Sequence, residues 1–241
     1  MLAVQYDGTA YAGWQRQAEQ MTVQEELERA LAQVLGREMR VTAASRTDAG
    51  VHALGQVVTL ETEVPIPVDN LVRALNDHLP QAVHVVEGGE VPEAFHPRFA
   101  ASGKLYSYRI LNRPQGSPFL TRYAWHLPAP VLDLERMQAA ADRLQGRRDF
   151  SAFRSAGSCV QTTVRRLYRF ELERHGDLIE ASLEADGFLY QMVRNLMGAV
   201  VEVGAGQREP EEMTALLEGR DRTQVGPPAP PQGLCLVRVF Y

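Results

Sequence analysis

Hydrophobic and polar positions along the first ninety residues change period several times, which predicts helices and strands in alternation. The run 22–35 has the helical period, and Thr22 and Glu25 have the spacing of a capping box. Its apolar positions share one helix face: Val23, Leu27, Leu31 and Val34. A second helix is expected in DNLVRALNDHL, capped by Asp69. The strand-like runs are LAVQY, MRVTAA, LGQVVTLETE and AVHVVEGG, which completes the order β-α-β-β-α-β.

The second half of the chain repeats this order of elements with one additional helix. KLYSYRILN alternates like a strand, LDLERMQAAADRLQG is a helix ending at Gly146, and a hairpin turns near Gly176 and Asp177. A long apolar helix, GFLYQMVRNLMGAVVEVG, precedes a short helix opening near Pro210 and the final strand GLCLVRVFY. We therefore expect an α+β protein of two ferredoxin-like units, 1–100 and 101–241. Their strands would join into one mixed, mainly antiparallel sheet, with helices on one side and an open cleft on the other.

Composition restricts the class of protein but not its activity. The chain has 241 residues, 45% of them hydrophobic and 23% charged, which is ordinary for a water-soluble globular protein. No apolar run is long enough to span a membrane, and no signal-peptide pattern opens the chain. The two cysteines, Cys159 and Cys235, lack the spacing of a redox motif or a zinc site. These features predict a reduced, cytoplasmic protein.

The charge distribution modifies this picture. The net charge is −5, which argues against nucleic acid, yet Lys104 is the only lysine and the other basic residues are arginines. The stretch from His96 to Arg113 contains no acidic residue, and 147–169 contains six arginines against the single acid Asp149. Basic stretches interleaved with aromatic residues can hold RNA even in an acidic protein. Solvated strand faces explain either stretch equally well.

The segment AASRTDAGVHALGQVV, residues 43–58, carries the clearest candidate chemistry. Asp48 follows a strand and precedes the small residues Ala49 and Gly50, so a bulky substrate could approach its carboxylate. The simpler interpretation is a polar turn between two strands. A metal site formed with His52 would need helical spacing and a third ligand, and a glycosidase would need a second carboxylate. Neither is evident in the sequence.

Two further segments contain residues that stand out. In GKLYSYRI, Tyr106 and Tyr108 share one strand face beside Lys104, where an aromatic ring can stack on an extruded base or simply fill the core. In GFLYQMVRNLMG, Arg194 and Asn195 interrupt a strongly apolar helix. Because burying an unpaired charge is costly, Arg194 is expected to pair with a carboxylate.

Seven blocks together resemble the tRNA pseudouridine synthase A family, in that family's order and over nearly the whole chain. They are YDGTAYAGWQRQ, TVQEELERAL, SRTDAGVHALGQV, FHPRFAASGKLYSYRI, DFSAFR, FLYQMVRNLMGAVVEVG and GLCLV. The resemblance implies the pseudouridine synthase fold and isomerisation of uridine to pseudouridine at positions 38, 39 and 40 of tRNA. It also implies a homodimer in which one tRNA contacts both subunits, with no cofactor and no metal.

The resemblance also implies roles for individual residues. Asp48 matches the essential aspartate, termed the nucleophile by family convention, and Arg194 matches the arginine that pairs with it. Tyr106 matches the residue that stacks on the target base, Arg46 the arginine associated with base flipping, and Leu234 a hydrophobic residue packed against the active site. The residues expected to contact RNA are Phe95, His96, Arg98, Phe99, Lys104, Gly157, Ser158, Cys159 and Gln161.

Two other functions compete with this interpretation. A non-catalytic RNA-binding module of the same fold would make Asp48 and Arg194 dispensable, and it would usually carry an RNP-type aromatic signature, which is absent here. A hydrolase of free nucleosides would not need the arginine-rich stretches.

Overall fold

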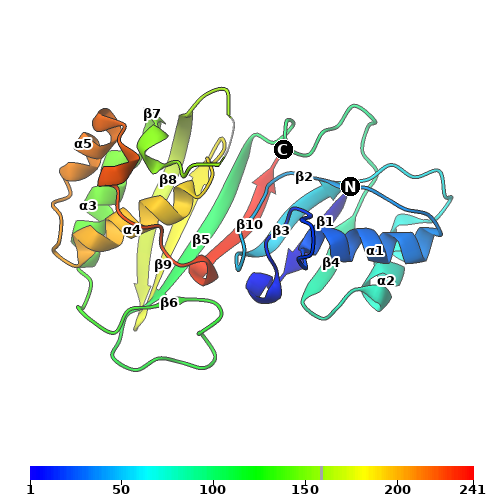
Figure 1. Cartoon of the computed structure of the whole chain (residues 1–241), viewed down its shortest axis with the longest axis horizontal. Helices are drawn as coiled ribbons and strands as arrows, with labels where there is room; N and C mark the ends of the chain where they lie inside the picture. The colour runs from blue at the N-terminus through cyan, green and yellow to red at the C-terminus, as the bar shows by residue number, and fades with distance from the viewer. Residues whose placement is uncertain (158–159) are drawn as a thin grey trace. The chain divides into compact units, whose positions relative to one another are not determined.

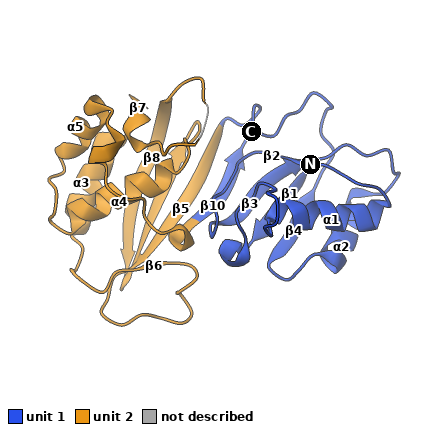
Figure 2. Ribbon diagram, viewed as in Figure 1, with its two compact units in different colours: residues 1–102, 235–241 blue, residues 103–234 orange. Residues whose placement is uncertain are grey.

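The computed structural model describes residues 1–157 and 160–241, which group into two compact units (Figure 2). Unit 1 comprises Met1–Ser102 and Cys235–Tyr241, and unit 2 comprises Gly103–Leu234. This grouping differs from the expected 1–100 and 101–241 mainly in the last seven residues, because the final strand pairs with a strand of unit 1. No helix in the described part of the chain has both the length and the apolar character needed to cross a membrane.

Unit 1 follows the predicted β-α-β-β-α-β order (Figure 1). Its elements are β1 (Leu2–Tyr6), α1 (Val23–Leu35), β2 (Thr42–Ala43), β3 (His52–Thr59), α2 (Val68–His78) and β4 (Val83–Gly88), joined by β10 (Leu234–Phe240). The strand order is β4-β1-β3-β10, with β2 on β3. All these pairs are antiparallel except β3 with β10, which is parallel.

The N-terminal cap of α1 is the expected residue, whereas the cap position of α2 differs from the expected one. The Thr22 side chain caps α1 by accepting a hydrogen bond from the Glu25 backbone N–H at 3.4 Å. In α2 the expected cap Asp69 instead lies in the first turn, after Pro67 at the cap position, where its charge favours the helix dipole. Pro67 supplies no side-chain acceptor and the helix begins at Val68, so the expected cap Asp69 lies two residues after the observed cap position.

Unit 2 places its helices on one face of a second set of strands (Figure 1). Its elements are β5 (Gly103–Leu111), β6 (Trp125–His126), α3 (Leu134–Leu144), β7 (Gly146–Asp149), β8 (Val164–His175), β9 (Leu178–Ala185), α4 (Met192–Gly204) and α5 (Glu212–Gly219). The strand order is β5-β9-β8-β7, antiparallel throughout, with β6 parallel to β5. Strict alternation of buried and partly exposed residues along β9 leaves a polar face opposite the helices.

The two units together confirm the predicted fold class, α+β with mixed and mainly antiparallel pairing. The expected hairpin turns at Gly176 and Asp177, between β8 and β9. The long apolar helix begins later than its hydrophobic run, at Met192, because Gln191 adopts a left-handed conformation with φ 58°. Gly146 begins β7 instead of ending α3.

Candidate active site

Asp48 lies in the loop between β2 and β3 of unit 1, and the backbone of this loop is held from several sides. The Trp14 N–H donates to Thr47 O at 3.1 Å, and the Val51 N–H donates to Asp48 O at 3.1 Å. Gly13 packs so closely that a Cβ there would lie 2.7 Å from Thr47 O, and its φ of 102° favours glycine. The backbone of the loop therefore packs closely against the YDGTAYAGW segment. The Asp48 side chain itself is partly exposed.

A buried polar network fixes which side chains of the loop point outward. The Gln56 amide binds both backbone groups of Ser45, accepting from its N–H at 3.2 Å and donating to its carbonyl at 2.7 Å. The hydroxyl groups of Tyr6 and Thr47 are hydrogen-bonded at 2.8 Å. Because Thr47 is buried, Arg46 is exposed and Asp48 is partly exposed, the loop alternates between anchoring and outward-facing side chains.

His52 has a structural role in this loop. Its ring is 6% exposed, and Nδ1 accepts a hydrogen bond from the Gly8 N–H at 3.0 Å. Asp7 Oδ1 also lies 3.2 Å from Nδ1, so Gly8 and Asp7 together hold the ring in position. Among the described residues, no group of three or more His, Cys, Asp or Glu side chains is arranged to hold a metal ion.

In unit 2 the two tyrosines of β5 have different environments. Tyr106 is 5% exposed and meets Phe188 edge to face, with ring centroids 5.1 Å apart. Tyr108 is fully buried, donates to Pro230 O at 2.7 Å and packs edge-on against Trp125. Burial raises the pKa of Tyr108 far above its usual range, and the nearby Arg194 charge opposes this only in part. Tyr108 is therefore a neutral core residue.

Arg194 lies near the start of α4 and is tied to the segment before β10. Its Nε donates to Ala229 O at 2.7 Å, and its own carbonyl accepts from the Ala229 N–H at 2.9 Å. The guanidinium direction is therefore set by a fixed backbone oxygen. The next residue, Asn195, has no exposed surface and donates to Phe153 O at 2.8 Å. Sequence reasoning noticed Asn195 only as an interruption of the apolar helix.

Leu234 is 6% exposed and begins β10 directly after a glycine that admits no side chain. A Cβ on Gly233 would lie 2.7 Å from the ring of Tyr108 and 2.8 Å from Arg109 O. Gly233 of the GLCLV block thus packs directly against Tyr108. Unit 2 accordingly brings together Tyr108, Arg194 and the stretch 229–234.

The residues expected to contact RNA differ in exposure. In unit 1, Phe99 is 78% exposed, its ring lies 4.3 Å from that of His96, and the Arg98 guanidinium carbon lies 5.9 Å from its centroid. Phe95 packs instead on Tyr241, with centroids 5.0 Å apart. The HPRF turn therefore presents a stacked, cationic and aromatic surface.

The remaining predicted RNA contacts lie in unit 2. Lys104 is partly exposed on β5, and Gly157 and Gln161 are exposed. Ser158 and Cys159 lie outside the described residues. Of the predicted catalytic residues, Asp48 belongs to unit 1, whereas Tyr106, Arg194 and Leu234 belong to unit 2.

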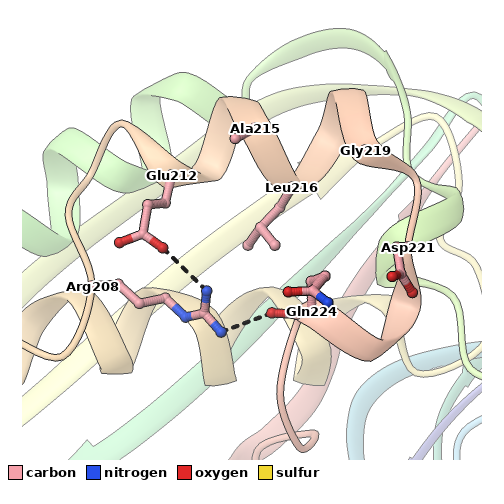
Figure 3. A pocket seen from close by; sticks show the side chains of 7 residues that line it. All are labelled: Arg208, Glu212, Ala215, Leu216, Gly219, Asp221 and Gln224. Atoms are coloured by element: carbon pink, nitrogen blue, oxygen red, sulfur yellow. Dashed lines mark hydrogen bonds and ion pairs between the residues drawn. The ribbon is translucent and has the colours of Figure 1, made fainter.

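A separate hollow of about 210 Å³ lies at α5 of unit 2 (Figure 3). Arg208 is its basic residue, but that side chain points at Glu212 (3.4 Å) and at Gln224 O (2.7 Å) and also pairs with Glu202. The positive charge of Arg208 is thus compensated by the carboxylates of Glu202 and Glu212. None of the residues predicted to act in catalysis lines this hollow, so we do not assign the active site to it.

Comparisons with known proteins agree with the resemblance of the motifs. A family model described as tRNA pseudouridine synthase matches residues 2–100 and 140–241. A tRNA pseudouridine synthase A of Thermoanaerobacter sp. (strain X514) is 44% identical, with 100% of this chain and 98% of the relative covered. One from Syntrophotalea carbinolica is 43% identical over 100% of this chain and 95% of that protein.

Among solved structures, the crystal structure of a Cbf5-Nop10-Gar1 complex is 14% identical, with a TM-score of 0.35 over 83% of this chain and 54% of that chain. Because this TM-score is low, the assignment depends on the family model and the sequence relatives. Both cover most or all of the chain and the RTDAGVHA loop that presents Asp48. The chain belongs to the tRNA pseudouridine synthase family.

Proposed function

We propose that this protein isomerises uridine to pseudouridine at positions 38, 39 and 40 in the anticodon stem-loop of tRNA. Its family membership gives the reaction class. The observation that carries the proposal is the rigid loop around Asp48, in which buried neighbours leave one carboxylate partly exposed beside small residues. Such pre-organisation suits a residue that acts on a bulky substrate.

The reaction needs few chemical groups. The glycosidic bond between C1′ and N1 breaks, the uracil rotates, and C5 bonds to C1′; C5 then loses its proton and N1 gains one. Because the product is an isomer of the substrate, neither water nor a redox partner is consumed. A carboxylate near C1′ can attack it, stabilise positive charge on it, or remove a proton from C2′. Asp48 takes one of these three roles in our proposal.

The other site residues are proposed to bind and orient. Arg194 would pair with Asp48 and hold it ionised, and its bond to Ala229 O supports a fixed direction for the guanidinium. Tyr106 would stack on the target uracil, which requires access to a ring that is now 5% exposed. Arg46 would take part in flipping the base out, and Leu234 would pack against the active site.

The RNA-contacting part of the proposal has its best support in the HPRF turn. Phe99 is too exposed to serve the core, and Arg98 and His96 flank its ring. Stacking on exposed aromatic rings is the usual way in which proteins bind unpaired bases. Lys104, Gly157, Ser158, Cys159 and Gln161 complete the proposed RNA contacts.

The test uses tRNA transcripts carrying tritium at uridine C5. Forming the new bond at C5 releases that tritium, so we expect release from wild-type transcripts and none once uridines 38, 39 and 40 are replaced. A hydrolase of free nucleosides would instead cleave the C1′–N1 bond of labelled uridine and give uracil that keeps its tritium at C5. Binding of tRNA with no release from any transcript would indicate the non-catalytic RNA-binding module.

The network behind the loop gives a further prediction. Gln56→Leu removes the two amide hydrogen bonds to the backbone of Ser45, so the loop should shift. We expect kcat to fall roughly 10- to 100-fold with little change in KM, because a misplacement of about 1 Å is that costly. Steady-state tritium release measures both constants. Gln5→Leu on β1 is the matched control, and equal losses in the two variants would contradict a positioning role for Gln56.

We also propose that the protein acts as a homodimer in the cytoplasm, with one tRNA touching both subunits. The support is the likeness to the family. Sedimentation at micromolar concentration should give about twice the monomer mass of 26.8 kDa. Sedimentation as a monomer in the presence of tRNA would contradict the dimer.

A further inference from the structure

Two pairs of arginines face each other where β7 and β8 pair at the edge of the unit 2 strands. Arg147 lies opposite Arg166, and Arg148 lies opposite Arg165. Like charges placed directly opposite on antiparallel strands destabilise the pairing. The fold thus carries an energetic cost at this edge that its own packing does not explain.

One of these pairs projects from the face without helices. Leu167, which pairs with Gly146, is buried on the helix side. Neighbouring positions alternate between faces, so Arg147 and Arg166 point to the opposite, open face. Beside them, Tyr168 is 47% exposed, and its ring centre lies 5.6 Å from the Arg166 guanidinium carbon. We call Arg147, Arg166 and Tyr168 the arginine–tyrosine patch.

Two acids lie beside the patch, Asp149 and Asp186, and neither forms an ion pair with a guanidinium group of the patch. Asp149 accepts from the Thr163 hydroxyl at 2.6 Å and pairs with Arg220 at 3.4 Å, and Asp186 accepts from the Arg166 backbone N–H at 2.9 Å. Within residues 1–157 and 160–241, no ion pair involves the guanidinium of Arg147 or Arg166.

Two other arginines on the unit 2 strands are paired with acids. Arg169 pairs with Glu171 at 2.6 Å, and Arg109 pairs with Glu180 at 3.1 Å. In the part of the chain that the structure describes, the guanidinium groups of Arg147 and Arg166 have no such carboxylate partner.

A simpler explanation is protection of an edge strand, since charged side chains on an edge prevent unwanted strand pairing. That purpose is served equally by an arginine facing a glutamate, which would also stabilise the sheet. It requires neither two arginines face to face nor an exposed tyrosine beneath one of them. Facing arginines can bind an anionic ligand, and an exposed tyrosine ring can stack on aromatic rings of that ligand.

We propose that the arginine–tyrosine patch binds the backbone of the tRNA substrate, with the two guanidinium groups on neighbouring phosphates and Tyr168 against a base or ribose. Arginine presents a fixed fork to phosphate oxygens, and stacking on tyrosine holds that fork flat. This inference rests on the proposed function, because it takes tRNA as the RNA. None of the patch residues is among the RNA contacts assigned above.

The test measures tRNA affinity as a function of salt by fluorescence anisotropy. Each lost phosphate contact lowers the salt slope by about 0.7–0.9, so Arg147→Gln with Arg166→Gln should lower it by about 1.4–1.8. The affinity should fall roughly tenfold or more near 0.1 M salt. Tyr168→Ala should weaken binding with little change in slope, because stacking releases no counterions. Thermal stability of the double variant should not fall, since a repulsion is removed.

The control replaces two exposed arginines of unit 1, Arg37→Gln with Arg73→Gln, which changes net charge equally. An equal change in the salt dependence of tRNA affinity for both double variants, or no change for either, would overturn the proposed role of the patch. Failure of wild-type protein to bind tRNA would also overturn it. The same samples are assayed for tritium release: binding with a patch-dependent slope but no release would reject the proposed isomerase activity and keep the patch.

Discussion

Asp48→Asn is expected to yield a folded protein that binds tRNA and forms no pseudouridine. The substitution keeps the size of the side chain and removes the negative charge that each of the three chemical roles requires. Losing a nucleophile or an essential electrostatic group commonly lowers kcat by about 10⁴-fold or more. Tritium release under single-turnover conditions, with enzyme in excess, gives this rate directly.

The fold should tolerate this change because the loop is held mainly by other groups. Thr47 O, Gly50 N and Val51 N make its backbone hydrogen bonds, and the Asp48 carbonyl contributes without its side chain. Asp77→Asn, on the exposed side of α2, is the matched control and should retain full activity. Asp48→Ala guards against deamidation of the introduced asparagine. Turnover by Asp48→Ala at more than about a hundredth of the wild-type rate would remove Asp48 from the reaction.

Local signals in the sequence predicted most of the elements. Thr22 and Glu25 open α1 as a capping pair, and Gly36 ends it with φ 70°, both consequences of residues within one turn. The hairpin at Gly176 depends on its own turn residues in the same way. The start of α4 moved because a backbone conformation intervened at Gln191.

Contacts between distant segments could not be predicted in this way. The final strand looks like any other alternating strand, and its membership in unit 1 follows from pairing with β3, nearly the whole chain away. Gln56 sits within an apolar strand run, and its role depends on Ser45. The sequence predicts that Arg194 needs a partner. It does not predict the hydrogen bond to Ala229 O, because that contact depends on the path of the chain before β10.

Among the residues whose partners lie far away in the sequence, Asn195 has the largest expected effect on the free energy of unfolding. Its amide donates to Phe153 O at 2.8 Å and to Ser155 Oγ at 3.2 Å, and its oxygen accepts from Arg222 at 2.9 Å. One fully buried side chain thereby joins α4 to the DFSAFR segment and to the turn after α5. The sequence contains no local signal for this arrangement, since the partners are 27 to 42 positions away.

Asn195→Leu keeps the number and branching of the side-chain heavy atoms but leaves the Phe153 carbonyl and the Arg222 guanidinium without this partner. Unsatisfied buried groups of this kind cost about 1–3 kcal/mol each, so we expect the free energy of unfolding to fall by about 3 kcal/mol. For a chain of this size the melting temperature should drop by roughly 6–12 °C, measurable by calorimetry. Asn70→Leu, on the exposed side of α2, should shift it by no more than about 2 °C. Equal melting temperatures for the two variants would mean that water or a neighbouring side chain replaces the amide, and that Asn195 does not hold these three segments together.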